Sequence, residues 1–312
     1  MPLDGKTLFI KLRNLLQESS DSTFLGDRTS YDYLYSAVEE TLKRTYAHTT
    51  QQVITTVASQ TAYNLNPDFL QLYMRDTMNN LMVKYNNGSA DYWPVFATYE
   101  HQFLSNQTTP IAIPYTFTIK EGSAATRLSG TTTSIGSASN GECTLADSTA
   151  SFTSTVTSGD IVHNVTDDSS GIVISVTSGT ALLTSLFDGT DNHWGSGDSY
   201  IISPRRRFQL ILDPPPSTAG HTITVPYIQR PTPVYSPYRS YNLSSSDYED
   251  AIVNYAAWLY KYQDREPSYG DRFYQFWDMK TRGLNNQVNI TKQRRRLFVN
   301  LMKPADTFRS RR

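Results

Sequence analysis

The sequence predicts an α+β protein, in which N- and C-terminal helices form a helical bundle, antiparallel β strands project from it, and a small all-β module is inserted. Three observations lead to this fold class. Helical periodicity occupies both ends of the chain, β-type alternation occupies the middle, and a Ser/Thr-rich acidic segment interrupts that alternation. The predicted regions are an N-terminal core segment (1–120), the inserted module (121–203), a C-terminal core segment (204–290) and a basic/apolar tail (291–312).

The first 47 residues predict two amphipathic helices. Residues 6–18 place Leu8, Leu12 and Leu15 at helical spacing. Residues 30–47 repeat the pattern, and Ser30 is a candidate N-cap.

The next segments favour strands, because they are rich in β-branched residues and alternate in polarity. We expect the strands 69–74 and 81–86 to pair with each other, and a helix to run from Ser89 to Leu104. The same alternation of β-branched and polar residues returns after the inserted module. The other expected strands of the core are 53–59, 205–212 and 221–231.

Residues 121–203 differ from the sequence on both sides. They contain nine acids and one basic residue, Arg127. Short apolar runs separated by Gly, Asp and Ser turns predict a β module rather than a disordered linker, because a linker would lack the apolar runs. Similar texture on both sides of a foreign segment indicates an insertion into a discontinuous core.

The C-terminal third returns to helical patterning. Ser246 and Glu249 form a capping box for a helix that carries Tyr248, Ile252, Tyr255, Leu259 and Tyr262 on one face. Pro267 suits the first turn of the next helix, and Gly283 is a candidate stop signal. The apolar faces at both ends of the chain need a common partner, and this requirement predicts the bundle.

The last 22 residues carry the strongest charge bias of the chain. They contain eight Lys or Arg against Asp306, a net charge of +7, whereas the whole chain carries −1. Basic and apolar residues alternate there, which is typical of an arm that docks on a larger partner; a solubilising basic terminus is the alternative. The predicted docking residues are Arg294, Arg295, Arg296, Leu297, Phe298, Leu301, Phe308, Arg309, Arg311 and Arg312.

The sequence predicts no catalytic, cofactor-binding or metal-binding residues. Phosphate-loop, dinucleotide-loop and zinc-protease motifs are absent, and the five histidines are scattered singly. The segment from Asp188 to Asp198 is rich in carboxylates that could bind a hard cation. Its spacing matches no calcium loop, and tight turns need the same residue types, so turns are the favoured interpretation.

The sequence also bears on location. The N-terminus resembles no signal peptide, and no apolar run is long enough to span a bilayer. One cysteine, Cys143, excludes an intrachain disulfide. We therefore expect a soluble protein that is made in a reducing compartment.

Four short motifs follow one another in the core segments: Tyr63–Phe69 (YNLNPDF), Leu212–Pro216 (LDPPP), Val225–Pro233 (VPYIQRPTP) and Asp250–Tyr260 (DAIVNYAAWLY). In this order they resemble the head-to-tail adaptor (connector) proteins of tailed bacteriophages, including the tail tubular protein A group. The resemblance covers roughly 1–117 and 204–290. The module resembles a β module that recurs in phage structural proteins, and the smallest adaptors lack such an insertion.

The resemblance implies a structural virion protein of the phage neck, assembled in the host cytoplasm. Family members form a homo-oligomeric ring, typically of twelve copies, beneath the portal. Their C-terminal segments insert into the portal protein, their outer parts receive the tail or nozzle protein, and DNA passes through without sequence-specific binding. No membrane or cofactor is implied. The alternatives are another phage tail or decoration protein, with the module as its interaction surface, and a phage-encoded enzyme.

Overall fold

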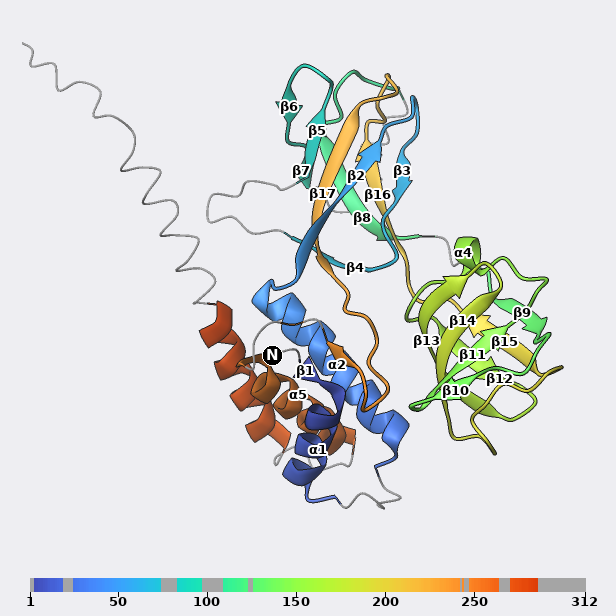
Figure 1. Ribbon diagram of the computed structural model, residues 1–312. Coiled ribbons are helices and arrows are strands. Elements are labelled where there is room, and N and C mark those ends of the chain that lie inside the picture. Colours follow the sequence, from blue (N-terminus) through green and yellow to red (C-terminus); the bar gives the residue numbers. More distant parts are fainter. Residues whose placement is uncertain are drawn as a thin grey trace, which may run out of the picture.

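The computed structural model describes residues 3–18, 25–73, 83–96, 109–122, 126–241, 243, 247–263 and 270–285. These residues form three bodies, which Figure 1 shows side by side. Helices lie at the lower left, two packed sheets lie above them, and a seven-stranded sheet lies at the right.

The predicted fold class is wrong, because the described residues are mostly β sheet and do not form a helical bundle with projecting strands. The strands belong to four sheets. Two of the three hydrophobic clusters lie inside the sheets, so the β regions are folded bodies with their own cores. The periodicity of the sequence identified which segments are helical, but it did not show how much apolar surface each region buries.

The helices pack together as one layer around the first hydrophobic cluster. The first helix buries Leu8, Leu12 and Leu16, and the Asp4 side chain caps it by accepting from the Lys6 N–H. A short strand pair, β1 with β18, joins the start of the chain to the segment before the C-terminal helices. The elements are β1 (Leu3–Asp4), α1 (Gly5–Leu16), α2 (Asp27–Thr45), β18 (Ser240–Tyr241), α5 (Asp247–Gln263) and helical residues 270–285.

Three details of the helices differ from the sequence prediction. Helix α2 begins at Asp27, so Ser30 lies inside it, and its hydroxyl donates to the Gly26 carbonyl. Gly283 lies within helical residues 270–285 and does not end them. In α5, Tyr262 is exposed, although the sequence placed it on the apolar face. The small residues Ala256 and Ala257 are buried instead, because small side chains let helices approach closely.

The two sheets above the helices form a sandwich around the second cluster. One sheet has the order β2-β17-β5-β6, with β4 pairing on β17, and the other has the order β3-β16-β8-β7. Tyr63 and Phe117 from one sheet share this cluster with Tyr85 and Tyr227 from the other. The strands are β2 (Thr49–Thr55), β3 (Ala62–Asn64), β4 (Phe69–Leu72), β5 (Lys84–Asn86), β6 (Asp91–Tyr92), β7 (Val95–Phe96), β8 (Thr116–Glu121), β16 (Phe208–Asp213) and β17 (Thr222–Gln229).

Two local predictions fail in this sandwich. The strands expected at 69–74 and 81–86 do not pair with each other; β4 and β5 each pair with β17, which comes from the C-terminal core segment. The helix expected from Ser89 is replaced over its described residues by β6 and β7, and residues 97–104 lie outside the described residues. Long-range pairing with β17 decided the first outcome. In the second, β6 pairs with β5 and β7 pairs with β8.

The seven strands between Leu128 and Ser203 pair with one another in the order β10-β11-β14-β13-β12-β15-β9. Their core holds Trp194, whose Nε1 donates to the Thr184 hydroxyl at 2.8 Å, and Tyr200, which donates to Asp147 at 2.7 Å. The elements are β9 (Leu128–Thr131), β10 (Ala138–Ser139), β11 (Glu142–Ala146), α4 (Phe152–Thr155), β12 (Ile161–Asn164), β13 (Ser169–Ser178), β14 (Ala181–Phe187) and β15 (Ser199–Ser203).

The inserted module and the sandwich both meet α2 at one ionic junction. Glu39 on α2 pairs with Arg205 at 3.1 Å and with Arg230 at 2.9 Å. Arg205 follows β15 and Arg230 follows β17, so a single carboxylate binds the two chain segments that leave these sheets. Ile172 and Ile174 of β13 add apolar contact, because they belong to the helical cluster.

Candidate interaction groove

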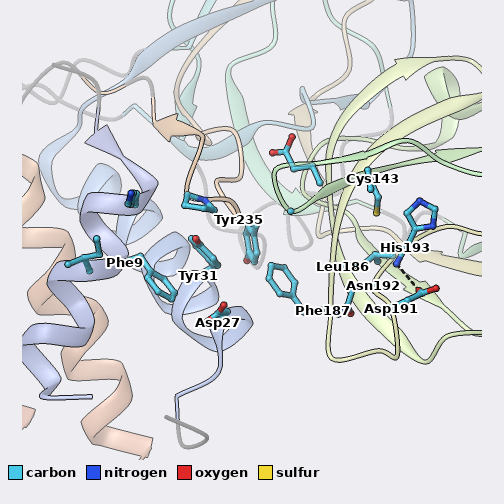
Figure 2. A pocket seen from close by; sticks show the side chains of 16 residues that line it. Phe9, Asp27, Tyr31, Cys143, Leu186, Phe187, Asp191, Asn192, His193 and Tyr235 are labelled. Carbon is cyan, nitrogen blue, oxygen red and sulfur yellow. Dashed lines mark hydrogen bonds between the residues drawn. The ribbon is translucent and has the colours of Figure 1, made fainter. Parts of the chain in front are cut away.

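A groove lies between the helical layer and the inserted module and has a volume of about 630 Å³. Figure 2 shows side chains from both regions lining it. We call it the helix–module groove. Its lining residues are Lys6, Phe9, Ile10, Asp27, Tyr31, Ala138, Gly141, Glu142, Cys143, Leu186, Phe187, Asp191, Asn192, His193, Tyr235 and Pro237.

Four aromatic side chains form a continuous apolar cluster along the groove. Phe9 of α1 stacks on Tyr31 of α2 with ring centroids 5.1 Å apart. Tyr31 in turn lies 6.3 Å from Phe187 of β14 and 5.9 Å from Tyr235. These separations are within the range of favourable ring contacts, so the cluster ties the module to the helices.

The titratable groups of this apolar cluster stay neutral near pH 7. Burial, followed by the charges of Asp27 and Asp4, raises the pKa of Tyr31, and burial together with Asp32 raises that of Tyr235. Burial raises the pKa of the Cys143 thiol to about 11, so the reactive thiolate is scarce. The groove therefore offers apolar, hydrogen-bonding surface rather than a nucleophile.

Carboxylates surround the groove, but some are already paired. Arg13 binds Asp27 at 2.9 Å, and Arg239 forms a bidentate pair with Glu142. Asp191 has no ion-pair partner among the residues that the structure describes. It lies in one of two adjoining turns of the module that we call the acidic lip, defined as Asp167, Asp168, Asp188 and Asp191.

Hydrogen bonds hold the acidic lip in shape. Asp167 accepts from the backbone N–H groups of Thr190, Asp191 and Asn192 at 2.8 to 3.1 Å. Burial would raise the pKa of Asp167, but these bonds hold it below its ordinary value. The Asp191 carboxylate accepts from the His193 N–H.

The carboxylate-rich segment Asp188–Asp198 is thus built of turns. One carboxylate oxygen of Asp198 accepts hydrogen bonds from both the Gly195 N–H and the Asn164 side-chain amide. Among the described residues, no group of three or more His, Cys, Asp or Glu side chains could hold a metal ion.

The negative charge of the chain is concentrated in the module. Residues 128–203 contain eight Asp or Glu and no Lys or Arg, a net charge of −8. Since the whole chain carries −1 and residues 291–312 carry +7, the rest of the chain is neutral. The chain is therefore one acidic module attached to a neutral core, with a basic C-terminal segment.

A second apolar surface lies on the C-terminal helices. We call it the helical aromatic face: Tyr262, Tyr274, Phe276 and Met279 are between 41% and 66% exposed. A neighbouring cleft of about 430 Å³ lies between Leu15 of α1 and Phe276, with an Asp250–Lys280 ion pair at its rim. It shares no lining residue with the helix–module groove.

The docking residues predicted from the sequence, Arg294 to Arg312, lie outside the described residues. The groove was not predicted from the sequence. The one feature of the sequence that points to the groove is the apolar pair Phe9-Ile10. These two residues lie outside the buried stripe of α1, which consists of Leu8, Leu12 and Leu16. An apolar residue off the buried stripe of a helix indicates a second contact.

Comparison with known proteins does not assign the chain to a family. No family model matches the chain, and a search of curated proteins finds no match. Within the described residues, no helix is long and apolar enough to cross a membrane.

Proposed function

We propose that this protein is a structural virion protein, a head-to-tail adaptor that forms a ring between the portal and the tail and lets DNA pass. The observation that carries the proposal is the presence of two unlike apolar surfaces, the helix–module groove and the helical aromatic face, on different sides of α1. Subunits of a ring contact each other head to tail, so each copy needs two different adhesive surfaces. The resemblance of the four sequence motifs to phage adaptors supports the same role.

Charge distribution supports passage of DNA. Residues 128–203 of the module, with eight acids and no Lys or Arg, repel phosphate, so DNA would not adhere to a ring that directs this module toward its channel. In this proposal the basic C-terminal segment docks on the portal protein, and the end of the sandwich that points away from the helices, at the top of Figure 1, faces the tail or nozzle protein.

Electron microscopy of the purified full-length chain, alone and mixed with the portal protein of the same virus, tests the proposal. We expect rings stacked coaxially on portals. Phe276→Asp should reduce ring formation, because it places a charge on the helical aromatic face, where Phe276 is 52% exposed. Ile135→Asp is the control, since Ile135 is 72% exposed but lies on the module. Failure to form rings or to bind portals under any condition would refute the adaptor role.

A further inference from the structure

We infer that the helix–module groove binds the C-terminal segment 291–312 of the same chain in the free protein. The segment would leave this site when it docks on the portal; that release, unlike the groove contact itself, rests on the proposed function. The groove would thus withhold the docking segment until a portal competes for it.

Charge is the first argument. The module carries −8 and residues 291–312 carry +7, while the rest of the chain is neutral. Within the acidic lip, Asp191 has no ion-pair partner among the described residues, and the Asp168 side chain is 95% exposed and reaches only His163, at 3.8 Å. Arginine forms bidentate hydrogen bonds with such carboxylates. The segment contains three consecutive arginines, Arg294, Arg295 and Arg296.

Apolar surface is the second argument. Ile10 is 46% exposed on the helical side of the groove, and the partly buried Phe9 and Phe187 lie beside it. The three arginines are followed directly by Leu297 and Phe298, and then by Leu301. A segment that places arginines at the acidic lip would therefore bring large apolar side chains to the groove at the same time.

Reach is the third argument. The described chain ends at residue 285, where the Asn285 amide donates to the Arg44 carbonyl near the C-terminal end of α2. The groove lies at the other end of α2, beside Asp27 and Tyr31. Nineteen residues make α2 about 28 Å long. Residues 286–293 could span about 26 to 29 Å when extended, which delivers Arg294 to the groove.

A link within one chain favours this arrangement over contact between copies. A short tether gives an effective concentration on the order of millimolar, so even weak charge and apolar contacts keep the segment bound. At high ionic strength the charge contribution falls, because exposed charges are screened.

Limited trypsin cleavage at Arg294–Arg296 in the full-length protein, without portal, tests the inference. We expect cleavage to be slower than in a free peptide of residues 291–312, and to accelerate with salt. Ile10→Ser and Asp191→Asn should each accelerate it by about five- to tenfold, which corresponds to loss of one good contact. Asn at 191 keeps the oxygen that accepts from the His193 N–H, so the turn survives.

Two matched variants serve as controls. Val53→Ser changes an apolar residue of β2 that is 59% exposed, and Asp271→Asn removes an exposed carboxylate from helical residues 270–285. Both should leave the cleavage rate unchanged. Equal rates in all four variants and in the free peptide would overturn the inference. Protection that disappears on dilution would also overturn it, because the contact would then lie between copies. Neither result bears on whether the protein binds portals.

Discussion

At the scale of single residues, Glu39 of α2 joins two separate chain segments. It is the shared partner of Arg205 and Arg230, and the Arg205 guanidinium also lies 4.8 Å from the Tyr35 ring centroid. All three charged side chains are at most one-quarter exposed. Loss of the carboxylate would leave two partly buried guanidinium groups without their anion.

We therefore expect Glu39→Gln to lower the free energy of unfolding by about 2 kcal/mol, after allowance for partial exposure. Urea denaturation followed by circular dichroism measures this change. Glu40→Gln is the matched control, since Glu40 pairs with Lys43 on the surface and should cost at most about 0.5 kcal/mol. Equal losses in the two variants would show that the junction is not special.

We expect Asp147 to make the module sensitive to acid. Burial would raise the pKa of its carboxyl, but hydrogen bonds from Tyr200 and Thr149 outweigh burial and hold the pKa below its ordinary value. The unfolded value is about 3.9. Because the folded value is lower, the carboxylate stabilises the fold above that pH, and the contribution is lost as the pH falls through the folded value.

Stability of the module should therefore decline below about pH 4, and Asp147→Asn should remove some of this acid dependence. The midpoint of urea unfolding, followed by tryptophan fluorescence at several pH values, measures the effect. Asp271→Asn, outside the module, is the control. An unchanged pH profile in Asp147→Asn would mean that other groups cause the acid sensitivity.

At the scale of elements, strand β13 belongs to two cores. Val173 lies in the core of the module, whereas Ile172 and Ile174 belong to the helical cluster. Successive residues of a strand point to opposite faces, so one strand can serve both. The module is thus attached by apolar packing in addition to the two chain segments that enter and leave it.

Replacing residues 121–203 by a short Gly/Ser linker should leave the helices folded but less stable. The helical layer keeps most of its cluster, while removal of β13 exposes the surface that Ile172 and Ile174 covered. Helical circular dichroism should persist, with cooperative melting at a lower temperature than in the full chain. Loss of the helical signal would show that the module is required for the core to fold.

At the scale of the whole molecule, the regions differ more clearly in net charge than in secondary structure. The core is neutral, the module is acidic and the C-terminal segment is basic. In the two proposals, the same arginines would make a contact within the chain and a contact with the portal. Both the adaptor proposal and the groove inference therefore predict an ionic contact that weakens as the salt concentration rises.

We expect deletion of residues 291–312 to abolish portal binding while changing the melting temperature little. Replacing Arg294, Arg295 and Arg296 by Ala should weaken portal binding in a salt-dependent way, because exposed ionic contacts are screened. Phe298→Ala and Leu301→Ala should weaken it with little salt dependence. Surface plasmon resonance on immobilised portal at several salt concentrations measures both effects. Undiminished binding of the truncated chain would show that the segment is not the docking element.

The sequence alone determined the positions of the helices at both ends, most strands and the strong charge separation. These features depend on neighbouring residues: the stripe of Leu8 and Leu12, the alternation in β17, and the absence of Lys and Arg from residues 128–203. The basic segment was also visible in the sequence, and its role stays a prediction.

Only the tertiary structure decided the pairing and the shared surfaces. The fold class was wrong because sequence periodicity does not show that the sandwich and the module each enclose a core. The expected pairing of 69–74 with 81–86 failed because β17, which follows the whole inserted module in the chain, pairs with both segments. The groove brings Ile10 and Asp191 together from distant regions of the chain. Contacts of that range depend on how whole layers pack, and no local pattern records them.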